Sequence, residues 1–151
     1  MELDVYRKIL IFTYDCEVEA EAIYNGIADK LKNKNLKELF LTLAMEENSH
    51  HRILRNFYNN PDNAQKFDGS KNYGVTETVE SPTLSDDMKP ADAFAIAIKT
   101  TEKAMMQYII LADGCSDPEQ KTVFNNLAAM ESEHKQKIKQ VLENMAYPEA
   151  W

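Results

Sequence analysis

Two short runs with the same spacing constrain the fold of this chain more than any other feature. Glu47 stands three residues before His50, and Glu131 stands three residues before His134. On a helix, side chains three residues apart project from the same face. The chain has three histidines in all, and two of them lie in this spacing. We therefore expect both runs to lie on helices, each with its carboxylate and imidazole pointing the same way.

Both runs interrupt apolar stripes that recur at steps of three and four residues, the period of a buried helix face. The first stripe consists of Leu36, Phe40, Leu43, Glu47, His50, Leu54 and Phe57. The second consists of Phe124, Leu127, Glu131, His134, Ile138 and Val141. Polar groups inside such a stripe are costly unless they are paired or bound to metal. Two facing Glu-x-x-His helices are the ligand pattern of di-iron and di-manganese carboxylate proteins. A single Glu-x-x-His run is usually a solvated surface pair. The prediction of a metal site therefore depends on the presence of two such runs.

Composition narrows the class of protein. The 151 residues are expected to form a single domain over 1–151, and a hydrophobic content of 44% with only four glycines suits a helical protein. The net charge of −8 argues against nucleic-acid binding. No apolar run approaches the ~20 residues of a membrane span. Cys16 and Cys115 form no CxxC pair, and the acidic N-terminus lacks the order of a signal peptide. We expect a cytoplasmic protein.

Four helices are expected, with one long interruption. They cover about 4–32, 36–58, 90–113 and 118–147, and the stretch 59–89 is rich in Pro, Gly, Asn, Asp and Ser. A connection of this length allows a crossover between parallel helices, whereas a short turn would join antiparallel neighbours. The predicted fold class is all-α: a four-helix bundle of two helical hairpins joined by a long crossover loop.

The two hairpins are related by an internal repeat. Glu47 and Glu131 are 84 residues apart (131 − 47), and so are His50 and His134 (134 − 50). The same offset, without a gap, matches further aromatic and apolar positions: Tyr24 with Tyr108, Phe40 with Phe124, and Leu43 with Leu127. Matched aromatics and matched Glu-x-x-His runs at one offset indicate two copies of one helical unit.

These motifs resemble the rubrerythrin branch of the ferritin-like superfamily, over essentially the whole chain except the crossover loop. In that family the first and third helices each carry a Glu seven residues before a Tyr, and here Glu17 stands seven residues before Tyr24. The resemblance implies a ferritin-like bundle with a metal-ligand set of Glu17, Glu47, His50, Glu131 and His134. It also implies that Tyr24 and Tyr108 lie beside the metals, where a phenol can hydrogen-bond a ligand carboxylate and take part in catalysis. Alternatively, both tyrosines are core residues whose hydroxyls reach a partner.

The third helix departs from the family pattern. The position seven residues before Tyr108 is Thr101, which cannot act as a carboxylate ligand. In one interpretation the five-residue ligand set persists asymmetrically, with water or hydroxide in the vacancy. In a second, a π-bulge brings in Glu102, which a regular helix would turn about 100° off the ligand face. In a third, Glu21, one turn after Glu17, supplies the missing oxygen. We favour the first.

The donor set favours iron or manganese, and zinc is also able to bind. We expect two ions, with iron first among the candidates. The resemblance implies a redox protein that reduces peroxide or dioxygen, or oxidises Fe(II). Family enzymes also carry a small iron site with two CxxC pairs; this sequence has none, so a separate donor protein such as a rubredoxin is expected to supply electrons. The alternatives are a non-catalytic protein that binds or stores iron or manganese at a partly degenerate site, and an oxygenase acting on an organic substrate. Assembly as a homodimer is expected.

Overall fold

The computed structural model describes residues 1–76 and 83–144. The elements follow one another as α1 (Leu3–Lys30), α2 (Lys34–Tyr58), the short 3₁₀ helix η1 (Pro61–Lys66), α3 (Pro90–Gly114) and α4 (Pro118–Asn144). The described residues form no strand, only an isolated antiparallel bridge between Phe67 and Cys115. The all-α prediction is confirmed. Within the same two segments, no helix is both long and apolar enough to cross a membrane.

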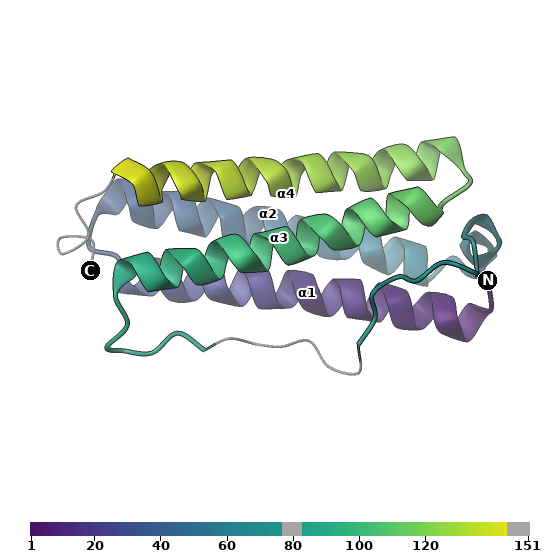
Figure 1. Ribbon diagram of the computed structural model, residues 1–151, viewed down its shortest axis with the longest axis horizontal. Coiled ribbons are helices and arrows are strands. Elements are labelled where there is room, and N and C mark those ends of the chain that lie inside the picture. Colours follow the sequence, from purple (N-terminus) through teal and green to yellow (C-terminus); the bar gives the residue numbers. More distant parts are fainter. Residues whose placement is uncertain (77–82, 145–151) are drawn as a thin grey trace.

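The four long helices form a bundle of two hairpins (Figure 1). α1 packs along α2 and α3 packs along α4, while α1 also contacts α3. The connection after α2 begins at the end of the bundle where α1 starts and leads to the opposite end, where α3 starts. α2 and α3 therefore run in parallel. This confirms the predicted bundle of two hairpins joined by a crossover.

Local sequence signals account for the starts of α2 and α3. The side chain of Asn33 accepts a hydrogen bond from the Leu36 backbone N–H at 3.1 Å, so α2 begins at Lys34, two residues before the predicted start. α1 ends at Lys30, not at residue 32, because Leu31 is already extended. Pro90 opens α3, as expected. The predicted last residues of the fourth helix, 145–147, lie outside the described residues.

The end of α3 shows a close approach. Gly114 is the last residue of α3, and a Cβ added there would lie 2.2 Å from the Tyr73 hydroxyl oxygen. The Tyr73 ring comes from the crossover connection, and its hydroxyl donates a hydrogen bond to the Asp68 carbonyl at 2.8 Å. Glycine is therefore needed here because the crossover packs directly against the helix end.

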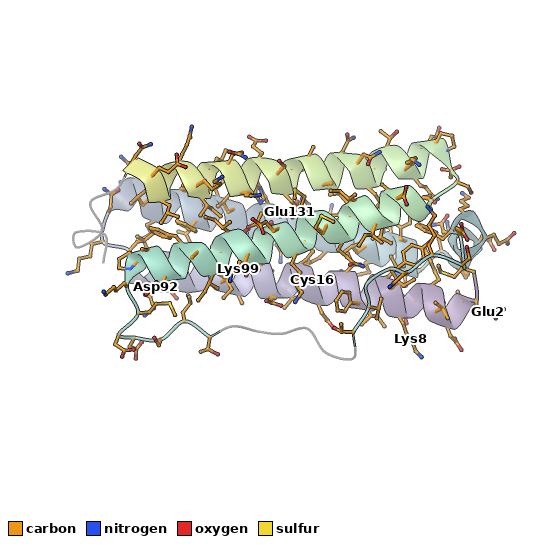
Figure 2. The ribbon with its side chains drawn as sticks, in the orientation of Figure 1. Glu2, Lys8, Cys16, Asp92, Lys99 and Glu131 are labelled. Carbon is orange, nitrogen blue, oxygen red and sulfur yellow. The ribbon has the colours of Figure 1, made fainter. Side chains whose placement is uncertain are left out.

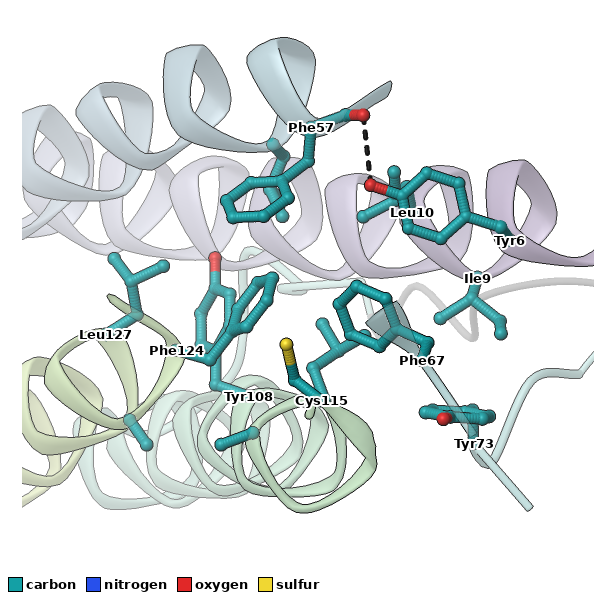
Figure 3. Close-up of a cluster of buried hydrophobic side chains, with 14 of the residues drawn as sticks. Tyr6, Ile9, Leu10, Phe57, Phe67, Tyr73, Tyr108, Cys115, Phe124 and Leu127 are labelled. Carbon is teal, nitrogen blue, oxygen red and sulfur yellow. Dashed lines mark hydrogen bonds between the residues drawn. The ribbon is translucent and has the colours of Figure 1, made fainter. Parts of the chain in front are cut away.

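The buried side chains divide into two apolar clusters with a polar layer between them. One cluster gathers around Tyr6, Phe57, Phe67, Tyr108 and Phe124 (Figure 3). The other contains Phe40 and Phe94, whose rings stack with centroids 5.4 Å apart. Along each long helix the buried polar positions fall between the residues of the two clusters, and Glu131 lies near the middle of the bundle in Figure 2. The fold thus encloses a polar layer with apolar packing on both sides.

Candidate metal centre

The polar layer contains every residue of the predicted ligand set. Glu17, Glu47 and Glu131 are 0% exposed, and His50 and His134 are 1% exposed. One comes from α1, two from α2 and two from α4. Three fully buried carboxylates are strongly unfavourable unless cations or protons compensate their charge. The burial of Glu47 and Glu131 at stripe positions is what the helical period predicts.

One group of side chains is compact enough to hold an ion. Four ligand atoms, one from each residue, all lie within 4.8 Å of one another, and the residues are Glu17, Glu47, His50 and Glu131. The His50 Nδ1 atom is central to this group. It lies 3.2 Å from Glu17 Oε2, 3.4 Å from Glu131 Oε1 and 3.7 Å from Glu47 Oε2. This group is the candidate for a first ion position.

A second, related arrangement surrounds His134. Its Nδ1 atom lies 2.8 Å from Glu47 Oε1 and 3.7 Å from Glu131 Oε2. Each of these two carboxylates therefore directs one oxygen toward His50 and the other toward His134. The two 3.7 Å distances are also equivalent, because each joins a histidine to the glutamate three residues earlier. The geometry follows the internal repeat, and the space between His134 and these two carboxylates is the candidate for a second ion position.

Unpartnered oxygens show that the centre fits a cation. At the centre, four buried carboxylate oxygens have no hydrogen-bond partner among the described residues: Glu17 Oε1, Glu47 Oε2, and Oε1 and Oε2 of Glu131. Buried polar atoms are normally paired, so such a concentration calls for an explanation. Carboxylate oxygens with imidazole nitrogens are suitable donors for iron, manganese or zinc. This cluster supports metal binding.

The charges of the ion-free centre are balanced by protons. Burial opposes protonation of His50, but the contacts and charges of Glu131 and Glu17 outweigh it and raise the pKa of His50 to about 9. Burial raises the pKa of Glu131 to about 7, and burial with the charge of Glu17 raises the pKa of Glu47 well above its usual range. A protonated imidazole thus lies where a metal cation is expected, so metal and proton compete.

Thr101 is fully buried at the position of the missing carboxylate. Its hydroxyl donates to the Ala97 carbonyl at 2.7 Å and makes a short hydrogen bond with the Tyr24 hydroxyl. A threonine hydroxyl has a single proton, so Tyr24 must be the donor in the second bond. The repeat matches this pair with Glu17 and Tyr108. Burial and the charge of Glu17 raise the pKa of Tyr108 well above its usual value, although its hydroxyl has no hydrogen-bond partner among the described residues.

Neither proposed replacement carboxylate reaches the centre. The side chain of Glu102 is 45% exposed and pairs with Lys135 Nζ at 3.2 Å. α3 is a regular α-helix throughout its length, without the π-bulge that would turn Glu102 inward. Glu21 lies 3.6 Å from His51 Nε2 and accepts from Asn48. The structure therefore agrees with the interpretation in which the ligand set is asymmetric.

Sequence reasoning missed one residue of the site, Glu46. Its Oε2 makes a short contact with Nε2 of His134, on the opposite side of the ring from Glu47. Glu46 is adjacent to the stripe on α2 and its side chain is 36% exposed, so the helical period does not mark it as inward. The signal lay in the repeat: the 84-residue offset matches Glu46 with Met130, which breaks the symmetry.

Comparison with known proteins agrees with this fold. A Thermotoga maritima protein assigned to the ferritin-like diiron-carboxylate proteins superposes with a TM-score of 0.77, at 22% identity, covering 95% of this chain and 96% of the other. A hypothetical protein from Pyrococcus furiosus superposes with a TM-score of 0.72, at 25% identity, covering 95% of this chain and 92% of the other. No curated protein matches. The profile of the rubrerythrin family matches residues 8–142, and the chain belongs to that family.

Proposed function

We propose that this protein holds two metal ions, with iron the expected metal, and reduces peroxide with electrons from a separate donor protein. The observation that carries the proposal is the division of the oxygens of Glu47 and Glu131 between His50 and His134. A carboxylate that directs one oxygen to each of two imidazoles is placed to bridge two ions. Membership of the rubrerythrin family supports the same assignment.

In this proposal each residue has a distinct binding role. Glu17 and His50 would hold the first ion, His134 would hold the second, and Glu47 and Glu131 would contact both. Two redox-active ions held there would supply one electron each, which balances the reaction H₂O₂ + 2H⁺ + 2e⁻ → 2H₂O. The two apolar clusters on either side of the polar layer exclude bulk water, which strengthens electrostatic interactions inside it.

The two tyrosines would orient groups of the centre and would not change charge. Both are 0% exposed, and burial raises the pKa of each well above its ordinary value, so both hydroxyls keep their protons. Tyr24 donates to Thr101. Tyr108, seven residues after Thr101, is the corresponding donor for Glu17 once that carboxylate binds an ion.

The source of electrons is also part of the proposal. The sequence contains no CxxC pair, and both cysteines are isolated and buried. We propose that electrons come from a small redox carrier of the rubredoxin kind. Dioxygen is the second candidate oxidant. A homodimer in the cytoplasm stays a prediction from the sequence.

Stopped-flow absorbance tests the proposal. The Fe(II)-loaded protein is mixed anaerobically with H₂O₂ and then with a chemical reductant. Rapid oxidation at the centre, reversed by the reductant, is expected for the native protein. It should be lost in His50→Gln and retained in His51→Gln, which changes an adjacent histidine outside the ion positions. Iron that stays bound without oxidation would refute the redox role and favour the storage alternative, which the missing carboxylate at Thr101 also favours.

A further inference from the structure

The two ion positions differ in one ligand. His50, Glu47 and Glu131 at the first position correspond to His134, Glu131 and Glu47 at the second. The first position adds Glu17 Oε2, 3.2 Å from His50 Nδ1. The second has Thr101 at the equivalent place, and that hydroxyl is occupied by Ala97 and Tyr24. Three protein side chains thus face the second position, against four at the first.

The Nε2 atoms of the two histidines, which lie on the far side of each ring from the ion positions, also differ. Here it is the second position that has the additional carboxylate. Nε2 of His50 is buried and has no hydrogen-bond partner among the described residues. Nε2 of His134 contacts the Glu46 carboxylate. The repeat matches Glu46 with Met130, whose side chain is uncharged, so the first position has no equivalent contact. The second position therefore lacks a counterpart of Glu17 but has the Glu46 carboxylate behind its histidine.

A carboxylate behind a ligating histidine has a defined effect. Because it accepts the proton of one ring nitrogen, it fixes the tautomer, leaves the other nitrogen free to bind a cation, and makes that nitrogen more basic. Here Glu46 accepts from Nε2, so Nδ1 is the nitrogen directed at Glu47 and the second ion position. Removing an outer partner of this kind typically weakens metal binding 10- to 100-fold.

We infer that the centre has a tight first position and a weak second position, and that Glu46 is the positioning residue that maintains the second by holding His134. The inference rests on the proposed function only in assuming that metal binds here. Glu46 itself contacts no ion. The missing fourth ligand lowers the affinity of the second position, and the negative charge behind His134 partly offsets that loss.

Metal titration tests the inference without reference to activity. The full-length, ion-free protein is titrated with Mn(II), and electron paramagnetic resonance counts free, isolated and exchange-coupled ions. The native protein is expected to bind one ion and then a second at least tenfold more weakly, with coupling at the second step. Binding of two ions in one step with equal affinity, or of a single ion only, would overturn the inference.

Variants identify the residue responsible. Glu46→Ala should weaken the second step at least tenfold and leave the first within twofold, and Glu46→Gln, which keeps a neutral acceptor, should fall between it and the native protein. Glu133→Gln is the matched control, because it removes the same charge from the residue next to His134. The side chain of Glu133 is 65% exposed and pairs with Lys137. A Glu46→Ala second step equal to the native one would overturn the role of Glu46.

The converse variant restores the missing ligand. Thr101→Glu should tighten the second step at least tenfold, because Tyr24 can then donate to a carboxylate as Tyr108 is placed to do for Glu17. Circular dichroism confirms that the variant is folded, and the Glu46 series decides the question if it is not. None of these outcomes depends on reaction with peroxide. The stopped-flow experiment alone tests the redox proposal. A protein that binds no Mn(II), Fe(II) or Zn(II) would refute the metal centre as a whole.

Discussion

The ion-free protein should lose stability as the pH rises from 7 to 9.5, because a buried imidazolium is then deprotonated among three carboxylates. His50 is 1% exposed, and contacts with Glu131 and Glu17 raise its pKa from 6.5 to about 9. At about 1.36 kcal/mol per pKa unit, the difference contributes about 3 kcal/mol to folding. Because the pKa of His50 is higher in the folded protein than in the unfolded chain, its contribution to the free energy of unfolding is fully present below pH 6.5. The contribution is lost as the pH rises through about 9. About 2 kcal/mol should disappear between pH 7 and 9.5.

Other groups of the centre do not reverse this sign. Burial lowers the pKa of His134, so its effect is confined to pH values below about 6.5. The pKa of Glu131, raised by burial to about 7, and that of Glu47, raised by burial and the charge of Glu17, act in the same direction as that of His50. The window from pH 7 to 9.5 therefore reports on the protonated imidazole of His50 together with the protonated carboxyl of Glu47, and both lower the stability as the pH rises.

Urea unfolding of chelator-treated protein measures this effect, with circular dichroism as the signal. The free energy of unfolding should fall by at least about 2 kcal/mol across the window, which is the amount given by the pKa of His50 alone, and Glu47 adds to it. In Mn(II)-saturated protein the fall should vanish or reverse, because a metal ion takes the place of the proton and binds better at higher pH. His51→Gln should behave as the native protein does. A stability of the ion-free protein that is flat or rises over this range would refute the charge arrangement described for the centre.

Three further predictions concern single side chains. Thr101→Val leaves the buried Tyr24 hydroxyl without its acceptor and should cost about 1–3 kcal/mol in urea unfolding, whereas an unchanged stability would show that the bond contributes nothing. His134→Ala should reduce bound metal, measured by mass spectrometry of the purified protein, while the helical circular dichroism spectrum is retained; full metal content would exclude His134 as a ligand. Phe40→Ala opens a cavity beside Phe94 and should cost about 3–5 kcal/mol, against less than about 0.5 kcal/mol for the exposed Val5→Ala, and similar costs for both would contradict the packing described here.

The helical period predicts most of the bundle and its buried layer. The stripe positions expected to face inward are buried, Glu47 and Glu131 included, and only the stripe ends Leu36 and Val141 are half-buried. Periodicity succeeds here because each long helix packs one face against its neighbours. The sequence also predicts that Thr101 has no carboxylate to match Glu17, because an internal repeat shows each position at which its two copies differ.

The helical period does not predict the contacts that side chains make between different helices or with the crossover connection. Glu46 lies beside its stripe, and its contact with His134 depends on how α2 and α4 are placed relative to each other. The bond between Tyr24 and Thr101 depends in the same way on the packing of α1 against α3. Tyr73, from the crossover connection, approaches Gly114 through a contact about forty residues apart in sequence. None of these distances follows from the spacing of residues within one helix.

Anomalous diffraction from crystals of the protein loaded with Mn(II) or Fe(II) tests the central claim most directly. The account predicts a strong peak enclosed by Glu17, Glu47, His50 and Glu131, and a weaker peak between His134 and the same two bridging glutamates. Both peaks should disappear in Glu47→Ala crystals. Metal bound only at the protein surface, with no anomalous peak in the polar layer between the two apolar clusters, would contradict it.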